Sequence, residues 1–421
     1  MSIIRISGVH TLDIIKRISS RPNPAPHTQA FAIINNHEGG IIDQVMVVFH
    51  PGPNSYTGEN LAEISCHGNP LVVDRIMEAI ALTGLARRAH KGEFTRRAFL
   101  NNKIDLLQAE AVGALIGSSS SAGCEMAHAL LKGELSERIK ALITDLMGIL
   151  ADIEASFITD DSSIRPDELF QRLEDATSRT KGLLKDANQA KGVYKGIVTT
   201  IAGLPNVGKS SLFNAILGYD RAIVHHEEGT TRDVIREHLS LGGIDFVFHD
   251  TAGIRETASG PEQLGVEKTI ETLKGSDLVL YVVDVREGIK PRERHMLSLA
   301  DKTIVVMNKV DLIEDTLKPL EGYDAVAVSA KFGHGIDELL SAMRQAFPHD
   351  QPLVFLDRHA HLLGKTLESL ESCSKAIADG FTADVLTIDL KQAIEYLRQM
   401  MGEAVDEDIL ERIFSSFCIG K

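Results

Sequence analysis

The sequence predicts an α/β plus all-α architecture, in which a second α/β module is inserted into a helical domain. Strand-like runs alternate with turn clusters over residues 1–97, as in a small α/β domain. Helical periodicity occupies residues 98–195, stops, and resumes over 351–421. Between these halves, residues 196–350 alternate apolar, β-branched runs with helical segments. That alternation is typical of a doubly wound parallel sheet.

The N-terminal domain is predicted from short apolar runs bounded by turn residues. The strand-like runs cover 31–34, 44–49 and 61–64, and one helical pattern covers 71–82. A Pro-Gly-Pro-Asn cluster at 51–54 separates two of the runs, as expected where a chain turns. We therefore expect a small α/β domain at this end of the chain.

One predicted helix carries apolar residues at alternating spacings of four and three. They are Leu135, Ile139, Leu142, Leu146, Ile149 and Ile153. Such a seam fits either the core of a helical bundle or a coiled coil with a partner chain. The bundle is favoured because fewer than three heptads are sustained.

Composition excludes several classes of protein. A formal charge of −15 argues against indiscriminate coating of nucleic acid, so any RNA contact must be local. The four cysteines are scattered without a CxxC pair, which fits free thiols in a reducing cytosol. No apolar run approaches the roughly 18 residues that span a bilayer. We expect a cytoplasmic protein with no membrane segment.

A glycine-rich loop predicts a nucleotide triphosphate site. The run Gly203-Leu-Pro-Asn-Val-Gly-Lys-Ser210 lies between a strand-like segment at 197–202 and a helical one at 211–217. Glycines allow backbone N–H groups to converge on phosphate, while Lys209 reaches the β and γ oxygens and Ser210 offers its hydroxyl to Mg²⁺. The expected nucleotide contacts in this loop are Asn206, Val207, Gly208, Lys209, Ser210 and Ser211.

Two further segments fit the γ-phosphate and its magnesium ion. Asp250-Thr-Ala-Gly253 follows a strand-like run, and Glu228-Gly-Thr-Thr-Arg-Asp233 precedes it in the chain. The carboxylate of Asp250 and the hydroxyl of Thr231 are suited to Mg²⁺, and Thr231 is the expected switch residue. The contacts predicted here are Thr230, Thr231, Asp250, Thr251, Ala252 and Gly253.

The choice of base rests on the run Asn308-Lys-Val-Asp311. The Asp311 carboxylate can accept hydrogen bonds from N1–H and N2–H₂ of guanine, whereas adenine offers neither donor. Asn308 is expected to brace the loop and approach N7 and O6. The base-contacting residues are predicted to be Asn308, Lys309, Asp311, Ser329, Ala330 and Lys331. Three segments in this order predict a GTPase.

The residue that orients the attacking water is not evident at its usual position in the sequence. Ile254 follows the Asp-Thr-Ala-Gly segment, where many GTPases carry a glutamine that orients the attacking water. Isoleucine cannot hydrogen-bond water. Hydrolysis must therefore be slow, or another group and another positive charge enter the site from elsewhere.

Five other segments make a specific resemblance. They are Tyr56-Thr-Gly-Glu59, Glu63-Ile-Ser-Cys-His-Gly68, Gly92-Glu-Phe-Thr-Arg-Arg-Ala-Phe99, Asp105-Leu-Leu-Gln-Ala-Glu-Ala111 and Phe417-Cys-Ile-Gly-Lys421. Together with the GTPase segments they resemble the MnmE (TrmE) family of tRNA-modification GTPases over essentially the whole chain.

The resemblance implies an architecture and a reaction. Residues 1–97 would bind a tetrahydrofolate one-carbon donor, in the 5,10-methylene or 5-formyl form, and form a homodimer. Residues 98–195 and 351–421 would form the helical domain, interrupted by a Ras-like P-loop GTPase domain at 196–350. With the FAD-dependent partner MnmG (GidA), the family adds a carboxymethylaminomethyl-type group at C5 of the tRNA wobble uridine. The alternative is a regulatory GTPase switch in ribosome or RNA assembly.

The resemblance also implies how hydrolysis proceeds. In the family the GTPase domains meet across the dimer, and K⁺ takes the place of an arginine finger. The K⁺ positions carry over to Asn206, His225, Glu227 and Thr230, and the water-orienting glutamate to Glu262. The Mg²⁺ positions remain Ser210, Thr231 and Asp250. Lys209, Thr231 and Glu262 are the expected catalytic residues.

For the folate site, charge suggests Arg5, Glu63, Arg96 and Lys421, although ordinary salt bridges are an equal interpretation of the first three. Cys418 is either a reactive thiol or a packed small side chain. A dense basic stretch comprises Arg87, Arg88, His90, Lys91, Arg96 and Arg97. It could bind tRNA phosphates or the glutamate tail of folate, or it could be a solvent-exposed surface without a ligand.

Overall fold

The computed structural model describes most of the chain, and the account below concerns those residues. They are 1–118, 121–156, 166–218, 223–226, 237–241, 244–248, 273, 275–290, 293–294, 297, 302–313, 323–347, 356–379, 383–403, 405–415, 417 and 420. The chain divides into two compact units. The first contains Met1–Ile116, Leu130–Thr177 and Lys365–Lys421, and the second contains Gly117–Ala129 and Ser178–Gly364.

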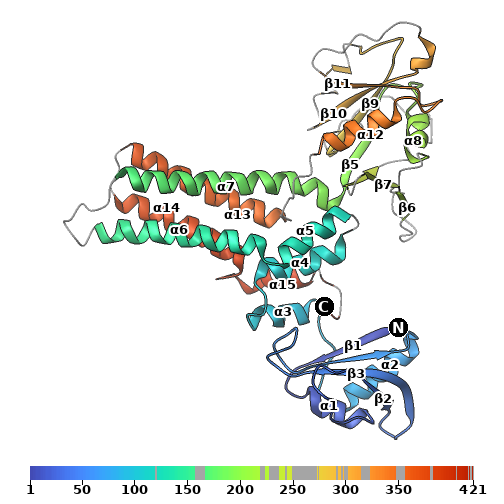
Figure 1. The fold of residues 1–421 in the computed structure, drawn as a ribbon, viewed down its shortest axis with the longest axis vertical. Helices are drawn as coiled ribbons and strands as arrows, with labels where there is room; N and C mark the ends of the chain where they lie inside the picture. The colour runs from blue at the N-terminus through green and yellow to red at the C-terminus, as the bar shows by residue number, and fades with distance from the viewer. Residues whose placement is uncertain are drawn as a thin grey trace. The chain divides into compact units, whose positions relative to one another are not determined.

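The N-terminal part of the first unit is a four-stranded antiparallel sheet with strand order β1-β4-β3-β2 (Figure 1). The strands are β1 (Ser2–Ser7), β2 (Ala30–Asn35), β3 (Ile41–His50) and β4 (Leu61–Cys66). Helices α1 (Thr11–Ile18) and α2 (Pro70–Leu82) pack on the sheet. The strands and the helix predicted at 31–34, 44–49, 61–64 and 71–82 are confirmed. The strand β1 and the helix α1 add to them.

Local sequence explains where α2 begins. The side-chain oxygen of Asn69 accepts a hydrogen bond from the backbone N–H of Leu71 at 2.9 Å, and Pro70 occupies the first turn. An asparagine cap satisfies an otherwise unpaired donor, and proline there removes a donor that would have no partner. The helix then buries Ile76 and Ile80 against the sheet.

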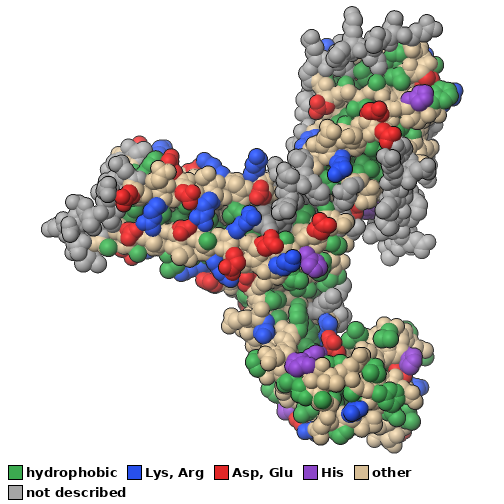
Figure 2. All heavy atoms as spheres, in the orientation of Figure 1, with side chains coloured by type: hydrophobic (Ala, Val, Ile, Leu, Met, Phe, Trp, Pro, Cys, Tyr) green, Lys and Arg blue, Asp and Glu red, His purple; other side chains and the backbone are tan. Residues whose placement is uncertain are grey.

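The helical elements lie on both sides of the second α/β module in sequence. They are α3 (Glu93–Leu100), α4 (Leu106–Gly117), α5 (Ser121–Leu131), α6 (Glu134–Ser156), α7 (Pro166–Lys195), α13 (Asp357–Ala378), α14 (Ala383–Met401) and α15 (Glu407–Ser415). Figure 2 shows acidic and basic side chains interspersed along the helical face that it presents. None of the described helices combines the length and the apolar composition that a bilayer-spanning segment needs.

The predicted apolar seam of α6 is buried by other residues of the same chain. All six of its side chains, from Leu135 to Ile153, are at most 4% exposed. Helix α6 packs lengthwise on α14 (Figure 1), and Lys391 pairs with Glu154 across 2.8 Å. The helical-bundle interpretation is therefore confirmed, because an element of the same chain covers the seam.

The last described helix, α15, packs on α3 and α4. Phe414 and Phe417 join Leu106 in one apolar cluster. Gly92, which precedes α3, has φ +65°, and a Cβ atom there would lie 2.5 Å from the carbonyl oxygen of Phe414. The close approach of α15 to this turn therefore requires glycine.

The second unit contains a seven-stranded sheet with order β11-β10-β9-β5-β8-β7-β6. The strands from β11 to β8 are parallel neighbours, and β7 and β6 continue antiparallel. They are β5 (Ile197–Ala202), β6 (Ile223–His226), β7 (Glu237–Leu241), β8 (Ile244–Phe248), β9 (Leu278–Asp284), β10 (Thr303–Asn308) and β11 (Asp324–Val328). The predicted doubly wound module is confirmed.

The continuous apolar run in β9 has a direct explanation. Leu278, Leu280 and Val282 enter one apolar cluster, while Val279 and Tyr281 enter another. Alternate side chains of a strand point to opposite faces. The first cluster also contains side chains of α8 (Lys209–Leu217) and α12 (Ile336–Gln345). The second also contains Leu273 and Leu297, so both faces of the sheet are buried.

Candidate functional site

The glycine-rich loop joins the carboxyl end of β5 to the first residue of α8, as the sequence predicts. Gly208 has φ +100°, and a Cβ atom at this position would lie 2.2 Å from the side-chain nitrogen of Asn308. Asn206 also adopts a left-handed conformation, with φ +64°. A helix that begins directly after such a loop directs unpaired backbone N–H groups toward an anion.

Lys209 lies within this loop. Its ammonium group donates hydrogen bonds to the carbonyl oxygens of Gly203 and Leu204, at 3.0 and 2.9 Å. Burial lowers the pKa of the Lys209 ammonium, because the charged form is poorly solvated there. A phosphate beside Lys209 would supply the missing charge compensation.

Asn308 joins three loops at the carboxyl edge of the sheet. Its side-chain nitrogen donates to the carbonyl oxygen of Val207 at 2.9 Å, and its side-chain oxygen accepts from the backbone N–H of Ala330 at 3.0 Å. The residue is 2% exposed. The phosphate loop and both predicted base-contact loops thus meet through one amide, as expected for ligand sites in open parallel sheets.

Three other predicted base-contacting residues, Lys309, Asp311 and Ser329, lie in the same two loops that Asn308 connects. The hydroxyl of Ser329 donates to a carboxylate oxygen of Asp311 at 2.6 Å, which orients that carboxylate. Lys309 donates to the carbonyl oxygen of Asn206 at 2.7 Å and to the carboxylate of Asp284 at 2.9 Å. None of the sequence motifs indicates Asp284; an acid at the end of an apolar, strand-like run is the signal that could have pointed to it.

The structure brings together only part of the predicted site. Val207 is buried in the loop, and Ser210 and Ser211 lie in the first turn of α8. His225 lies in β6, opposite His238. The predicted residues that lie outside the described residues are Glu227, Thr230, Thr231, Asp250, Thr251, Ala252, Gly253, Glu262, Cys418 and Lys421. Within the described chain, no group of three or more His, Cys, Asp or Glu side chains could hold a metal ion.

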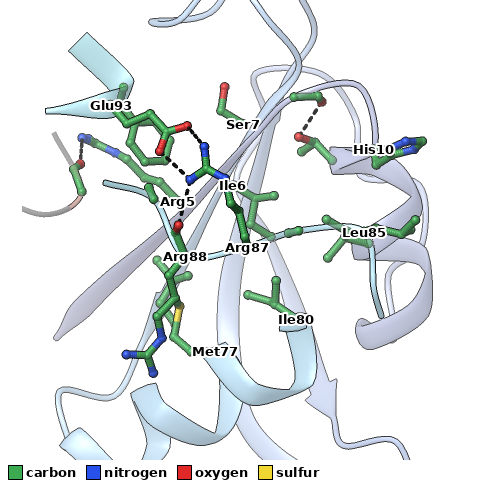
Figure 3. A pocket seen from close by; sticks show the side chains of 18 of the residues that line it. Arg5, Ile6, Ser7, His10, Met77, Ile80, Leu85, Arg87, Arg88 and Glu93 are labelled. Carbon is green, nitrogen blue, oxygen red and sulfur yellow. Dashed lines mark hydrogen bonds and ion pairs between the residues drawn. The ribbon is translucent and has the colours of Figure 1, made fainter. Parts of the chain in front are cut away.

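A second candidate site is a pocket of about 650 Å³ in the N-terminal part of the first unit (Figure 3). Its apolar lining includes Met77, Ile80 and Leu85, and its polar lining includes Arg5 and Ser7. The size and the mixed lining suit a small organic molecule with charged ends.

Glu93 organises the charged wall of this pocket. Arg87 contacts both oxygens of its carboxylate, at 2.9 and 2.8 Å, and Arg97 contacts one at 2.7 Å. Burial alone would raise the pKa of Glu93, but hydrogen bonds from Arg87, Arg97 and the backbone N–H of His90 lower it to about 2. Arg97 also contacts Glu59 at 2.8 Å. Both carboxylates are therefore already neutralised by arginine.

Arg88 differs from its neighbours. It lines the pocket, and Figure 3 shows its side chain directed away from Glu93. Among the described residues, its guanidinium group has no hydrogen-bonding or ion-pair partner. Arg88 is thus a cation available to an anionic ligand.

The predicted folate residues divide between the pocket and other contacts. Arg5 lines the pocket, donates to Glu63 at 2.8 Å and approaches the carbonyl oxygen of Gly420 at 3.4 Å. Glu63 is its cross-strand neighbour. Arg96 is not among the lining residues, because its guanidinium group pairs with Glu407 of α15. Sequence reasoning missed Glu59 and Glu93, whose partners are brought together only by the fold.

Comparison with known proteins covers the whole chain. The family model described as GTP-binding protein TrmE N-terminus matches residues 1–103, and the MnmE helical domain model matches residues 106–418. The tRNA modification GTPase MnmE of Moorella thermoacetica is 40% identical over 100% of this chain and 96% of the relative. The proteins of the same name from Carboxydothermus hydrogenoformans and Aquifex aeolicus are 38% and 37% identical over the same shares. The chain therefore belongs to the MnmE family of tRNA-modification GTPases.

Proposed function

We propose that this chain hydrolyses GTP in the cytoplasm and couples hydrolysis to modification of the tRNA wobble uridine at C5. It would act as a homodimer, with the FAD-dependent protein MnmG (GidA) as its partner, and add a carboxymethylaminomethyl-type group. The observation that carries the GTPase part is the junction at Asn308, which holds the phosphate loop against both base-contact loops. Family membership supports the tRNA part.

The reaction at the nucleotide is attack of water on the γ-phosphorus, with cleavage of its bond to the β–γ bridging oxygen. GDP and inorganic phosphate result. Lys209 would neutralise charge on the leaving oxygens, with support from the N-terminus of α8, which begins at this residue. Mg²⁺ and K⁺, when bound, would stabilise the negative charge that develops on the leaving side.

The residues fit these cations to the extent that they are described. Ser210 lies in the first turn of α8, where its hydroxyl is suited to Mg²⁺. Asn206 is exposed, and within the described residues its side-chain amide has no hydrogen-bonding partner, so its oxygen is available to K⁺. We propose Thr231 and Asp250 as the other Mg²⁺ ligands, and backbone or side-chain oxygens of His225, Glu227 and Thr230 as the other K⁺ ligands. Glu262 would orient the water.

Hydrolysis in K⁺ and in Na⁺ at equal ionic strength tests this mechanism. We expect K⁺ to stimulate turnover, and Glu262→Ala to lower kcat while the Kd for GDP stays unchanged. Equal rates in both salts together with full activity of Glu262→Ala would refute the cation-and-glutamate mechanism. Nucleoside analysis of tRNA from cells that lack the protein tests the coupling. Unmodified wobble uridines support it, whereas normal tRNA with defective ribosomes favours a regulatory GTPase switch.

We further propose that the N-terminal pocket binds the tetrahydrofolate one-carbon donor, in its 5,10-methylene or 5-formyl form. The apolar side chains of Met77, Ile80 and Leu85 suit a flat pterin ring. The guanidinium of Arg88, which has no partner among the described residues, suits a glutamate carboxylate. Arg5 lines the same pocket. The proposed reactive thiol Cys418 and the proposed contact Lys421 are close in sequence to Gly420, which lines the pocket.

Calorimetric titration with 5-formyltetrahydrofolate tests this site. Arg88→Ala should weaken binding about tenfold, as expected when one charged hydrogen bond is lost. Arg96→Ala is the matched control, because Arg96 belongs to the same basic stretch but pairs with Glu407. Equal losses in both variants, or none in Arg88→Ala, would show that the ligand does not bind through Arg88.

A further inference from the structure

Asp284 is a buried, ionised side chain at the carboxyl end of β9. Its side chain is only 5% exposed. One carboxylate oxygen accepts from the backbone N–H and the Nε of Arg286, at 3.1 and 3.0 Å. The other accepts from Nη2 of Arg286 at 2.7 Å and from Lys309 at 2.9 Å. Hydrogen bonds from Arg286, and with them the ammonium of Lys309, hold the pKa of Asp284 well below its usual range.

Lys309 connects this carboxylate to the phosphate loop. The same Nζ atom that contacts Asp284 also donates to the carbonyl oxygen of Asn206 at 2.7 Å. Asn206 has φ +64°, a left-handed backbone conformation that is uncommon outside glycine and that asparagine adopts more readily than most other residues. The carboxylate of Asp284 at the end of β9, the ammonium group of Lys309 and the carbonyl group of Asn206 thus form one continuous chain of contacts.

We infer that Asp284 is a positioning residue for guanine-nucleotide binding, which acts by fixing Lys309 against the carbonyl group of Asn206. Lysine has a long, flexible side chain, and holding it in one rotamer costs conformational entropy. Asp284 orders this side chain before the nucleotide arrives, and it keeps the base-contact loop and the phosphate loop at a fixed separation. A nucleotide that contacts both loops then binds a site that is already formed.

A merely structural role for Asp284 is the competing explanation. Its backbone carbonyl oxygen accepts from Glu287 and Gly288, at 2.9 and 3.1 Å, so the residue also closes a turn. Arg286 provides the matched control, since it contacts the same carboxylate but is 51% exposed and, within the described residues, its side chain contacts Asp284 and not the phosphate loop. Arg286→Gln retains the backbone N–H that donates to Asp284.

The experiment is a double-mutant cycle in the full-length protein. Asp284→Asn, Lys309→Met, the double variant and Arg286→Gln are titrated with a fluorescent GDP derivative, and KM and kcat are measured for GTP. We expect Asp284→Asn to raise Kd and KM about tenfold, from the loss of a charged hydrogen bond, with kcat changed less than about twofold. The double variant should bind no more weakly than Lys309→Met, and Arg286→Gln should change Kd less than about twofold.

Three outcomes would overturn the inference. The first is wild-type GDP affinity in Asp284→Asn, and the second is a double variant in which the fold-changes in Kd of Asp284→Asn and Lys309→Met multiply. The third is a loss of GDP affinity in Arg286→Gln equal to that in Asp284→Asn. Thermal unfolding of each variant checks that it is folded at the assay temperature. Should Asp284→Asn be unfolded, Asp284→Ser takes its place in the cycle, with the same expected loss and the same non-additivity with Lys309→Met.

Discussion

The side-chain nitrogen of Asn308 donates to the carbonyl oxygen of Val207 across 2.9 Å, and so ties the end of β10 to the loop that follows β5. Asn308 is buried and uses its side-chain oxygen for Ala330. Because the nitrogen and the oxygen of this amide both bond protein groups, the side chain of Asn308 primarily connects loops. Its removal therefore affects the base side and the phosphate side of the nucleotide site together.

Asn308→Ala leaves the carbonyl oxygen of Val207 and the N–H of Ala330 without their partner. Each unpaired buried group costs about 1–3 kcal/mol. We expect a lower midpoint of thermal unfolding and a Kd for GDP raised at least about tenfold. Asn214→Ala, on the exposed side of α8, is the control and should change neither quantity. Unchanged GDP affinity in Asn308→Ala would show that the junction is dispensable.

Gly208→Ala tests how closely the phosphate loop approaches Asn308. The new Cβ atom would lie 2.2 Å from the side-chain nitrogen of Asn308, in a residue at φ +100°. We expect GDP binding to be lost and stability to fall by about 1–3 kcal/mol. Gly288→Ala has a similar positive φ of +65° but no atom within 4 Å. It should therefore show the backbone strain alone, with GDP affinity retained.

Asp311→Asn should exchange the base that is recognised. An amide in place of the carboxylate can donate to the C2 carbonyl of xanthine, but it opposes the donors of guanine. We expect the Kd for GDP to rise roughly hundredfold, from two lost charged hydrogen bonds, and binding of XDP to improve. Competition titrations with both nucleotides measure the exchange. A variant that still prefers GDP would assign guanine recognition to another group.

Glu93→Gln should destabilise the protein in a pH-dependent manner. The pKa of Glu93 falls from its ordinary value of 4.5 to about 2 in the folded protein, so its ionised form stabilises the fold at neutral pH. That stabilisation is complete above about pH 5 and is lost as the pH falls through about 4.5 to 2.

Thermal unfolding of wild type and Glu93→Gln between pH 7 and pH 3 measures this effect. At pH 7 we expect the variant to be less stable by about 1–3 kcal/mol, because two arginines lose their shared partner. The difference should shrink on acidification. Glu78→Gln, at an exposed position of α2, is the control and should show no such trend. A difference that is constant with pH would assign the loss to packing.

The nucleotide site could be predicted from sequence where its residues are contiguous. The phosphate loop and the Asn308–Asp311 run occupy short segments whose spacing is set by one ligand, and both lie at the carboxyl edge of the sheet. Asp284 could not be assigned in this way, because its partner Lys309 is 25 residues away. The network of Glu59 and Glu93 is likewise created by tertiary contacts. Charge alone suggested Arg96 as a folate contact, but in the fold its guanidinium group pairs with Glu407 of α15.

The elements of the fold likewise divide into those that the sequence predicts and those that it does not. The apolar seam of α6 and the strand β9 were predictable because each follows one period throughout. Strands β6 and β7 gave no comparable signal. Four-residue β6 contains two histidines, and the sequence of β7 is Glu-His-Leu-Ser-Leu. Their place in the sheet follows from antiparallel pairing of β7 with β8 and of β6 with β7, which composition does not encode.

The buried seam of α6 restricts how the length of this helix can change. One inserted residue would rotate every later side chain by about 100° around the helix axis, which would carry Ile149 and Ile153 away from α14. Insertions or deletions of seven residues nearly restore the phase. Natural length variation should therefore accumulate in the connections between helices, and any change within α6 should occur in steps that nearly restore the phase, such as about seven or eleven residues.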